Sequence, residues 1–170
     1  QKAIYQKLGE QWHMSSLPET GSESNVRVYL DENNALILLD LSGLPLHKRG
    51  YRVDGGIAPL RETVAAVLLQ ELMWRRKIPL HDPFCGSGTI AVEAALMATD
   101  TAPGLLRKKP YPFESLPNFD KEAFDRVVEE AEERRRKAID ERDISIFASD
   151  ISRTAVEISK AAALKAGVYD

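Results

Sequence analysis

The sequence predicts an α/β fold, in which the chain from about residue 46 onward forms the first part of a doubly wound parallel sheet. Two observations predict this fold. The short apolar segments "KIPLHDPF" and "ISIFASD" have the composition of strands, and a helical pattern follows each of them. A glycine-rich turn joins the first strand to its helix. An aspartate stands at the end of each strand, Asp82 in the first and Asp150 in the second. Ligands of such sheets bind at the carboxyl ends of the strands, where both acids are expected to lie.

The first part of the chain has a different pattern. "VRVYL" alternates apolar and polar residues, which predicts a half-buried strand, and "ALILL" is a short apolar strand. Because the intervening "DENN" favours a turn, we expect a hairpin, preceded by the end of a helix in residues 1–10. The connector 40–59 is rich in glycine and proline and predicts a domain boundary. The chain begins at Gln1 within a helical pattern and stops just after a helix, so we interpret it as a piece of a longer protein.

Helical patterns account for most of the second part. A helix is expected to start at Pro59, with an apolar face made of Leu60, Val64, Val67, Leu68 and Leu72. The segment 89–98, "TIAVEAALMA", is apolar almost throughout, which predicts a helix packed on both sides. Residues 99–143 read as a long insertion that contains a charged helix. The final helix is expected to run from Ser152 as its N-cap to Gly167 as its stop.

Composition excludes several classes of protein. Apolar residues make up 44% and charged residues 29% of the chain, as in ordinary globular proteins. No apolar run reaches the roughly 18 residues of a membrane span, so we expect no membrane partner. Cys85 is the only cysteine, which excludes an internal disulfide and favours a reducing, cytoplasmic location. The net charge of −3 permits only a local basic face for nucleic acid, and the three histidines lack metal-ligand spacing, so no metal is expected.

The turn in "HDPFCGSGTI" carries the chemistry. Gly86 and Gly88 allow a ligand to approach backbone N–H groups, and the next helix points its positive end at the same space. The turn is not a P-loop because no lysine follows Gly88. The third glycine of a dinucleotide pattern would fall at Ala91, which leaves a nicotinamide or flavin site as a competing interpretation. Asp82 could hold an ammonium group and Asp150 a ribose diol, and together they favour S-adenosyl-L-methionine.

The same residues also have purely structural interpretations. Asp150 could be a plain helix N-cap, although Ser152 competes for that role. Asp82 could serve only to satisfy loop amides. Cys85 has no histidine beside it in the sequence, so we interpret it as a small packing residue rather than a nucleophile.

Charged stretches outside the turn are candidates for solvent-exposed faces or for RNA contacts. Arg61 and Glu62 could form a solvated pair in the first turn of a helix. The basic run at 133–138 lies on a helix dense in glutamate, which predicts a solvated face with i,i+4 pairs. Two other stretches, "LHKRGYR" and "LLRKKPY", mix basic and aromatic residues and are weak candidates for RNA binding. The residues concerned are Lys48, Arg49, Tyr51, Arg52, Arg107, Lys108 and Lys109.

Three sequence blocks resemble a known family. "LHKRGYR" with "APLRETVAAVLL" comes first, "DPFCGSGTI" follows, and "APGLLRKKPYPFESLPNFD" comes last. In this order and spacing they look like the bacterial ribosomal RNA guanine-N2 methyltransferases that carry a THUMP domain. The resemblance implies that residues 1–45 are the C-terminal part of a small α+β THUMP-like, RNA-binding domain. It also implies that residues 46–170 are the N-terminal part of a Rossmann-like class I methyltransferase domain, with 99–143 as an insertion.

The resemblance further implies a site for S-adenosyl-L-methionine. Asp150 would bind the ribose hydroxyls, and the block from Ala58 to Thr63 would close over the methionine end. Within that block the implied cofactor-binding residues are Pro59, Leu60, Arg61 and Thr63. The loop around the methionine part would be formed by Asp82, Pro83, Phe84, Cys85, Gly86, Ser87, Gly88 and Thr89.

The catalytic residues that the resemblance implies are not in the chain. The family's Asn-Pro-Pro-Tyr motif, or a close variant, lies further downstream, and neither Asn-Pro-Pro nor Asp-Pro-Pro occurs in these 170 residues. We therefore expect catalysis to depend on residues beyond Asp170 and this chain alone to be inactive. The expected substrate is ribosomal RNA. Other methyltransferases are alternatives: a transfer RNA guanine-N2 methyltransferase and an amino-group DNA methyltransferase. A non-catalytic RNA-binding fragment is the second class of protein considered, and a nicotinamide oxidoreductase is the third.

Overall fold

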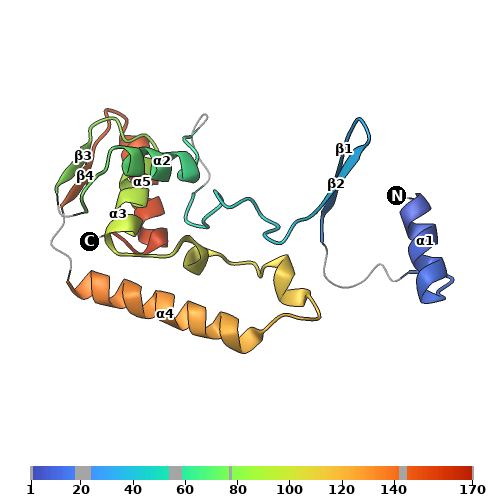
Figure 1. Cartoon of the computed structure of the whole chain (residues 1–170). Coiled ribbons are helices and arrows are strands. Elements are labelled where there is room, and N and C mark those ends of the chain that lie inside the picture. Colours follow the sequence, from blue (N-terminus) through green and yellow to red (C-terminus); the bar gives the residue numbers. More distant parts are fainter. Residues whose placement is uncertain (1, 18–23, 54–58, 77, 142–144, 170) are drawn as a thin grey trace.

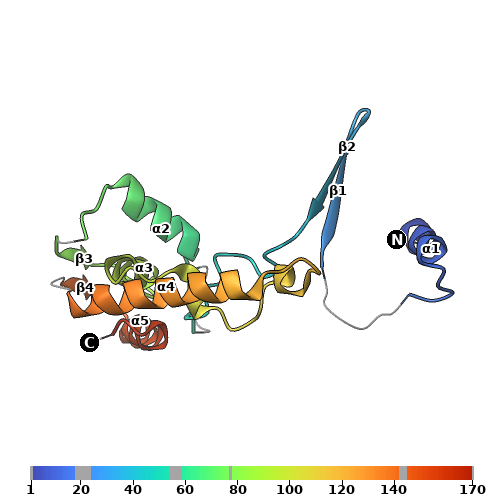
Figure 2. The same ribbon diagram turned by 60° about the horizontal axis from the view of Figure 1, so that its bottom comes forward.

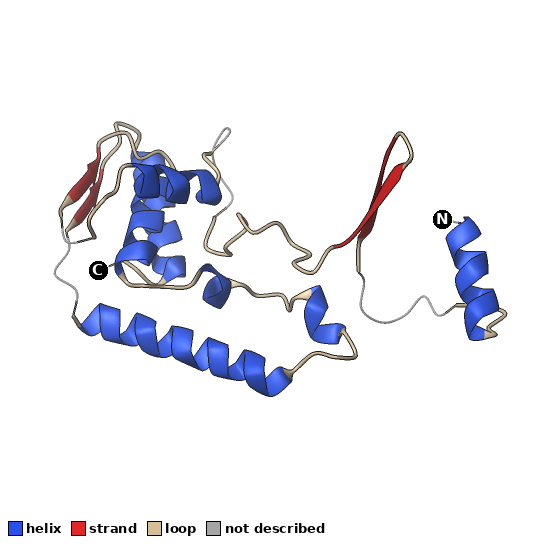
Figure 3. Cartoon of the chain, in the orientation of Figure 1, coloured by secondary structure: helices blue, strands red, loops and turns tan. Residues whose placement is uncertain are grey.

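The computed structural model describes residues 2–17, 24–53, 59–76, 78–141 and 145–169, and helices make up most of the regular structure (Figures 1 and 3). Its strands form two separate pairs. The elements in chain order are α1 (Lys2–Trp12), β1 (Val26–Asp31), β2 (Asn34–Leu39), α2 (Glu62–Glu71), β3 (Leu80–Asp82), α3 (Thr89–Ala98), the 3-10 turns η1 (Pro103–Leu106) and η2 (Pro112–Ser115), α4 (Lys121–Asp140), β4 (Ile146–Ala148) and α5 (Arg153–Ala166).

The pair of parallel strands is confirmed. β3 and β4 pair in parallel, with Leu80 opposite Ile146 and Asp82 opposite Ala148. Asp82 is the last residue of β3, whereas Asp150 lies two residues beyond the end of β4. Two strands of three residues make a very small sheet. Its function in the described chain is to place the two acids, and the loops that follow them, at one edge.

Helix α3 is the centre of the second part, as its apolar sequence predicts. Val92 and Leu96 form a buried cluster with Tyr51 and with two alanines of α5, Ala162 and Ala166. α2 packs against another side of α3, so α2 and α5 lie on opposite sides of it (Figure 2). Small residues let the helices approach closely, which is why alanine recurs in this core.

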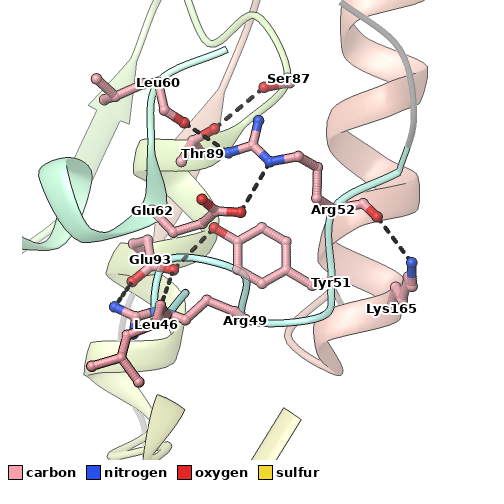
Figure 4. Close-up of polar contacts among 10 residues, drawn as sticks. All are labelled: Leu46, Arg49, Tyr51, Arg52, Leu60, Glu62, Ser87, Thr89, Glu93 and Lys165. Atoms are coloured by element: carbon pink, nitrogen blue, oxygen red, sulfur yellow. Dashed lines mark hydrogen bonds and ion pairs between the residues drawn. The ribbon is translucent and has the colours of Figure 1, made fainter. Parts of the chain in front are cut away.

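Buried ion pairs fix the connector before α2 onto the helices (Figure 4). Arg49 and the Tyr51 hydroxyl both donate to Glu93 of α3, which is 3% exposed. Arg52 pairs with Glu62, and Lys165 of α5 donates to the Arg52 carbonyl at 2.9 Å. The expectation that Arg61 and Glu62 form a solvated pair is therefore wrong for Glu62, which is 2% exposed.

The second helix departs from its sequence pattern in two ways. α2 begins at Glu62, so the expected start at Pro59 is wrong by three residues, and Arg61 has extended backbone angles at the N-cap. The predicted apolar face is exposed in the described chain, from Leu60 at 37% to Leu72 at 74%. The helix instead buries Ala65 and Leu69, because the small alanine allows close packing on α3.

The N-terminal hairpin is confirmed, but its expected burial is not. β1 and β2 pair antiparallel, with Val26 opposite Leu39 and Asp31 opposite Asn34. Every residue of both strands is exposed, so the half-buried face predicted from the alternation is wrong for the described chain. α1 has no buried residue either, and it lies at the far end of the molecule from the parallel strands (Figure 1).

The insertion is built around the long helix α4. The Asp120 side chain caps it by accepting from the Ala123 N–H at 2.9 Å. The helix has no fully buried residue, in agreement with the predicted solvated face, and Arg134 from the basic run pairs with Asp100. None of the described helices is long and apolar enough to cross a membrane.

Candidate functional site

The two glycines of the turn between β3 and α3 are needed for different reasons. Both have positive φ angles, +52° at Gly86 and +76° at Gly88, which side chains rarely adopt. A Cβ atom at Gly88 would overlap the side chain of Ser159 on α5, so this glycine allows two helices to pack. A Cβ at Gly86 would meet nothing within 4 Å. Gly86 therefore faces open space, as a backbone that receives a ligand should.

Asp150 connects the two strand ends rather than capping the helix. Its Oδ2 accepts from the Gly86 N–H and its Oδ1 from the Ser152 N–H, both at 2.9 Å. Ser152 is the N-cap of α5, because its hydroxyl accepts from the Ala155 N–H. The two backbone hydrogen bonds, Ser152 first and Gly86 second, lower the pKa of Asp150 from its usual 3.8, so the carboxylate is charged at neutral pH.

Asp82 has a local partner as well. Its Oδ1 accepts from the Phe84 N–H at 3.2 Å, which is the loop-amide role considered in the sequence. The Phe84 side chain is 87% exposed, so this aromatic ring is free on the turn. Asp82 also lines the cavity described next, and an ammonium group remains compatible with it.

The first turn of α3 supplies further donors. Gly88 occupies the N-cap position and, having no side chain, leaves the helix without a side-chain cap. The hydroxyls of Ser87 and Thr89 lie 3.3 Å apart at this end. An uncapped helix N-terminus carries partial positive charge and free N–H groups, which suit an anionic group.

A cavity of about 500 Å³ lies against this turn. Eight of the expected cofactor-binding residues line it: Pro59, Leu60, Asp82, Phe84, Cys85, Gly86, Ser87 and Thr89. Five do not: Arg61, Thr63, Pro83, Gly88 and Asp150. Of these five, Asp150 reaches the lining through its bond to Gly86. Ala58 lies outside the described residues.

The opposite wall of the cavity was missed by the sequence interpretation. It comes from Ile90 and from the start of α5, with Thr154, Ala155 and Ile158. A signal for it exists: a helix that begins directly after the acid of a parallel strand places its first turn at the same edge of the sheet. The spacing of Thr154 and Ile158 then puts both on one helix face.

Cys85 is a packing residue, as expected. It is 8% exposed, and burial raises the pKa of its thiol, which keeps it protonated and weakly nucleophilic. Within the described ranges no three His, Cys, Asp or Glu side chains are grouped as metal ligands would be. The cavity offers backbone donors, hydroxyls and the Asp82 carboxylate, and Asp150 is linked to its lining through Gly86.

Four of the seven expected RNA-contacting residues have partners within the chain. Arg49 and Tyr51 bind Glu93, and Arg52 binds Glu62. Arg107 donates to the carbonyls of Ser42 at 2.6 Å and Leu44 at 3.2 Å and stacks over the Tyr111 ring. Ion pairs and hydrogen bonds within the chain engage these four side chains, and their contact with RNA stays a prediction. The side chains of Lys48, Lys108 and Lys109 are exposed.

The connector, the glycine turn and the parallel strands together match a known family. The family model "UPF0020: RMKL-like, methyltransferase domain" matches residues 49–170. The chain belongs to this methyltransferase family. Membership overturns the nicotinamide oxidoreductase alternative. The matched residues begin at Arg49, within the connector that also carries Arg52.

Relatives of this methyltransferase domain include a curated protein and solved structures. "Putative RNA methyltransferase YpsC" of Bacillus subtilis strain 168 is 45% identical over 171 residues, which is 99% of this chain and 43% of YpsC. SMU.472, "a putative methyltransferase complexed with SAH", is 34% identical with a TM-score of 0.85, and the match covers 98% of this chain and 43% of that one. A "predicted N6-adenine-specific DNA methylase" from Listeria monocytogenes is 34% identical with a TM-score of 0.79, over 99% of this chain and 43% of that one. The methyltransferase chain thus spans less than half the length of these relatives.

Proposed function

We propose that this chain is the cofactor-binding part of an RNA methyltransferase that uses S-adenosyl-L-methionine and modifies the exocyclic N2 amino group of a guanine in large-subunit ribosomal RNA. The observation that carries the proposal is the glycine turn. Gly86 faces open space with a positive φ, between the uncapped end of α3 and the Asp150 carboxylate. Supporting it, SMU.472 was solved with SAH, the demethylated form of this cofactor, and YpsC is named as an RNA methyltransferase.

The residues around the cavity fit the cofactor's groups. Asp150 would accept hydrogen bonds from the ribose hydroxyls through the lone pairs that Gly86 and Ser152 leave free. Asp82 would face the ammonium group, and the apolar side chains of Leu60 and Ile158 would cover the rest. The bound cofactor supplies an electrophilic methyl group on a sulfonium. The chain's part is to hold that group in one place, since positioning contributes much of the rate of such reactions.

The target amino group would be oriented by residues outside this chain. The sequence contains no Asn-Pro-Pro or Asp-Pro-Pro motif, which the resemblance implies for that role. Residues 1–45 would belong to a THUMP-like RNA-binding domain, and the exposed lysines Lys48, Lys108 and Lys109 would contact the RNA backbone.

A transfer assay with the full-length protein tests the substrate. The protein is incubated with methyl-labelled S-adenosyl-L-methionine and with separate ribosomal RNA, transfer RNA and DNA from cells that lack it. Nucleosides from each acceptor are then separated by mass spectrometry. N2-methylguanosine in large-subunit ribosomal RNA is expected. N2-methylguanosine found only in transfer RNA would overturn the ribosomal RNA substrate and identify a transfer RNA methyltransferase.

One observation favours a second candidate function. The Listeria relative is named as a DNA methylase that acts on adenine N6. A guanine N2 and an adenine N6 are both exocyclic amino groups, so the same cofactor cavity serves either reaction. Label in N6-methyladenine of DNA, with none in either RNA, would establish this second function and overturn the RNA proposal.

A further inference from the structure

Arg52 carries a buried donor that no group among the described residues satisfies. Its Nε donates to Glu62 Oε1 at 2.9 Å, and its Nη2 donates to the Leu60 carbonyl at 2.7 Å. The remaining nitrogen, Nη1, is buried and has no hydrogen-bond partner in the part of the chain that the structure describes. Buried N–H groups are nearly always paired, so an orphan on a permanently charged guanidinium calls for a partner that is not part of the chain.

The position of this orphan is tied to the cofactor cavity. Leu60, whose carbonyl Arg52 holds, lines the cavity together with Ser87 and Thr89. In Figure 4 the third nitrogen points away from Glu62, to the side where Leu60 and Ser87 are drawn. Arg52 is held from the other direction as well, because Lys165 donates to its backbone carbonyl. The guanidinium is therefore fixed before any ligand arrives.

The positive charge of the Arg52 guanidinium indicates the chemistry of its missing partner. Arg52 is paired once with Glu62, whose side chain is 3% exposed, and its Nη2 already donates to the Leu60 carbonyl, so Nη1 is the nitrogen that remains for an oxygen acceptor. An arginine fork recognises a carboxylate with unusual strength because its hydrogen bonds are charge-assisted and planar. The ligand of the proposed function carries one carboxylate, at its amino acid end. Asp150 is linked to the cavity through Gly86 and stands just before α5, so the amino acid end would lie on the Leu60 side.

We propose that Arg52 binds the carboxylate of the cofactor's amino acid moiety through Nη1, while its other two nitrogens position the Leu60 segment beside it. This inference rests on the proposed function. It gives Arg52 a role that its sequence context, a basic and aromatic stretch, did not indicate. It also gives a reason for the Arg52–Glu62 pair to lie next to Leu60, which lines the cavity.

Two ligands that differ in the amino acid moiety test the inference. S-adenosylhomocysteine carries the carboxylate, and 5′-methylthioadenosine keeps the nucleoside and sulfur but lacks the whole amino acid end. Calorimetry on the full-length protein gives the dissociation constant of each ligand. Arg52→Met is expected to weaken S-adenosylhomocysteine binding about tenfold or more, the scale of a hydrogen bond to a charged group, and to change methylthioadenosine binding less than about twofold. If Arg52 has only a structural role, Arg52→Met would raise the dissociation constants of both ligands by the same factor, and that result would overturn the inference.

Arg49→Met is the matched control. Arg49 comes from the same connector and also pairs with a buried glutamate, but that glutamate, Glu93, forms a cluster with Tyr51 rather than with Leu60. Its removal is expected to leave the ratio of the two dissociation constants unchanged. A shift in that ratio as large as that of Arg52→Met would overturn the inference.

A measurement on the unaltered protein covers the case in which Arg52→Met does not fold. Decarboxylated S-adenosylhomocysteine keeps the ammonium group and loses only the carboxylate, and we expect it to bind about tenfold or more weakly than the parent ligand. Equal affinity for the two would overturn the Arg52 inference and leave the proposed function standing. No binding of either S-adenosylhomocysteine or methylthioadenosine would overturn the proposed function itself, and the inference with it.

Discussion

The Asp150 carboxylate accepts a hydrogen bond from the Gly86 N–H at 2.9 Å, across 64 residues of sequence. This bond joins the loop after β4 to the turn after β3. A backbone bond reinforces the join, since the Ser149 N–H donates to the Asp82 carbonyl at 2.9 Å. The two loops at the edge of the sheet therefore behave as one unit, in which Asp150 both shapes the glycine turn and borders the cavity.

Asp150→Ala is expected to weaken S-adenosylhomocysteine binding at least about tenfold, because charged hydrogen bonds to ribose and the anchor on Gly86 are lost together. Ser87→Ala removes one hydroxyl from the same loop and is expected to have a smaller effect. Calorimetry on the full-length protein measures both. Small and equal effects would mean that Asp150 acts only on local loop structure.

The loop junction is also expected to depend on pH. The pKa of Asp150 is lowered by its backbone bonds to Ser152 and Gly86, so ionised Asp150 stabilises the folded state above its unfolded pKa of 3.8. That contribution is lost as the pH falls through the lower, folded pKa. The difference in unfolding free energy between the unaltered protein and Asp150→Ala should be constant near neutral pH and vanish in strong acid. Denaturant unfolding over this pH range measures it, and a difference that grew in acid would contradict the assignment.

Replacing each of the two glycines by alanine is expected to affect a different property of the protein. Gly88→Ala places a Cβ against Ser159 and should lower the melting temperature. Gly86→Ala meets open space, so its cost is a positive-φ strain of about 1–2 kcal/mol plus a methyl group in the cavity, and its main effect should be on ligand affinity.

A second substitution separates the two glycine effects. Ser159→Gly removes the side chain that the new Cβ at position 88 would meet, so it should recover part of the melting temperature lost in Gly88→Ala. It should recover nothing in Gly86→Ala. Recovery in neither double variant would mean that backbone strain, rather than the helix contact, requires Gly88.

Arg49→Met is expected to destabilise the fold by about 3–5 kcal/mol, because it leaves the buried Glu93 charge with only Tyr51 as a partner. Arg134→Met is the matched control, since it breaks an ion pair with Asp100 in which Arg134 is 59% exposed. Exposed pairs of this kind contribute about 0.2–1 kcal/mol. Urea unfolding of both variants measures the difference, and equal losses would argue against a buried role for Glu93.

Residues 1–170 expressed alone are expected to be poorly soluble or partly molten. Apolar side chains are exposed along the hairpin and α2, with Leu30 at 78% and Leu72 at 74%, and Phe147 on β4 is 58% exposed. Exposed apolar surface of this extent promotes association, and a two-stranded sheet adds little stability. A sharp thermal transition of a monomer, combined with methyl transfer to RNA, would show that this expectation is wrong.

The local elements were predictable because each has a local cause. The parallel strands follow from two short apolar runs, and α5 follows from the Ser152 cap and from Gly167, whose φ is +68°. The glycine turn was predictable for the same reason, because φ > 0 leaves few residue types, and its binding of a ligand stays a prediction. The assignment of Asp150 to the ribose stays a prediction.

The parts that were not predictable depend on long-range partners. Arg49 and Glu93 are 44 residues apart, and nothing in the sequence of "LHKRGYR" distinguishes an arginine that enters a buried pair from one that meets RNA. The buried face of α2 was missed because Ala65 is less apolar than Leu68 but fits more closely on α3. The period of the apolar residues identifies an amphipathic helix, while tertiary packing determines which face of that helix is buried.

The pairs made by Arg49 and Arg52 also determine where the polypeptide can be trimmed for production. A shortened protein that started at residue 53 would keep Glu62 and Glu93 in the interior but discard both cations and the Tyr51 ring. Trimming before Leu46 removes the hairpin and α1 and leaves both pairs intact. Shortened versions of this protein should therefore begin at or before Leu46.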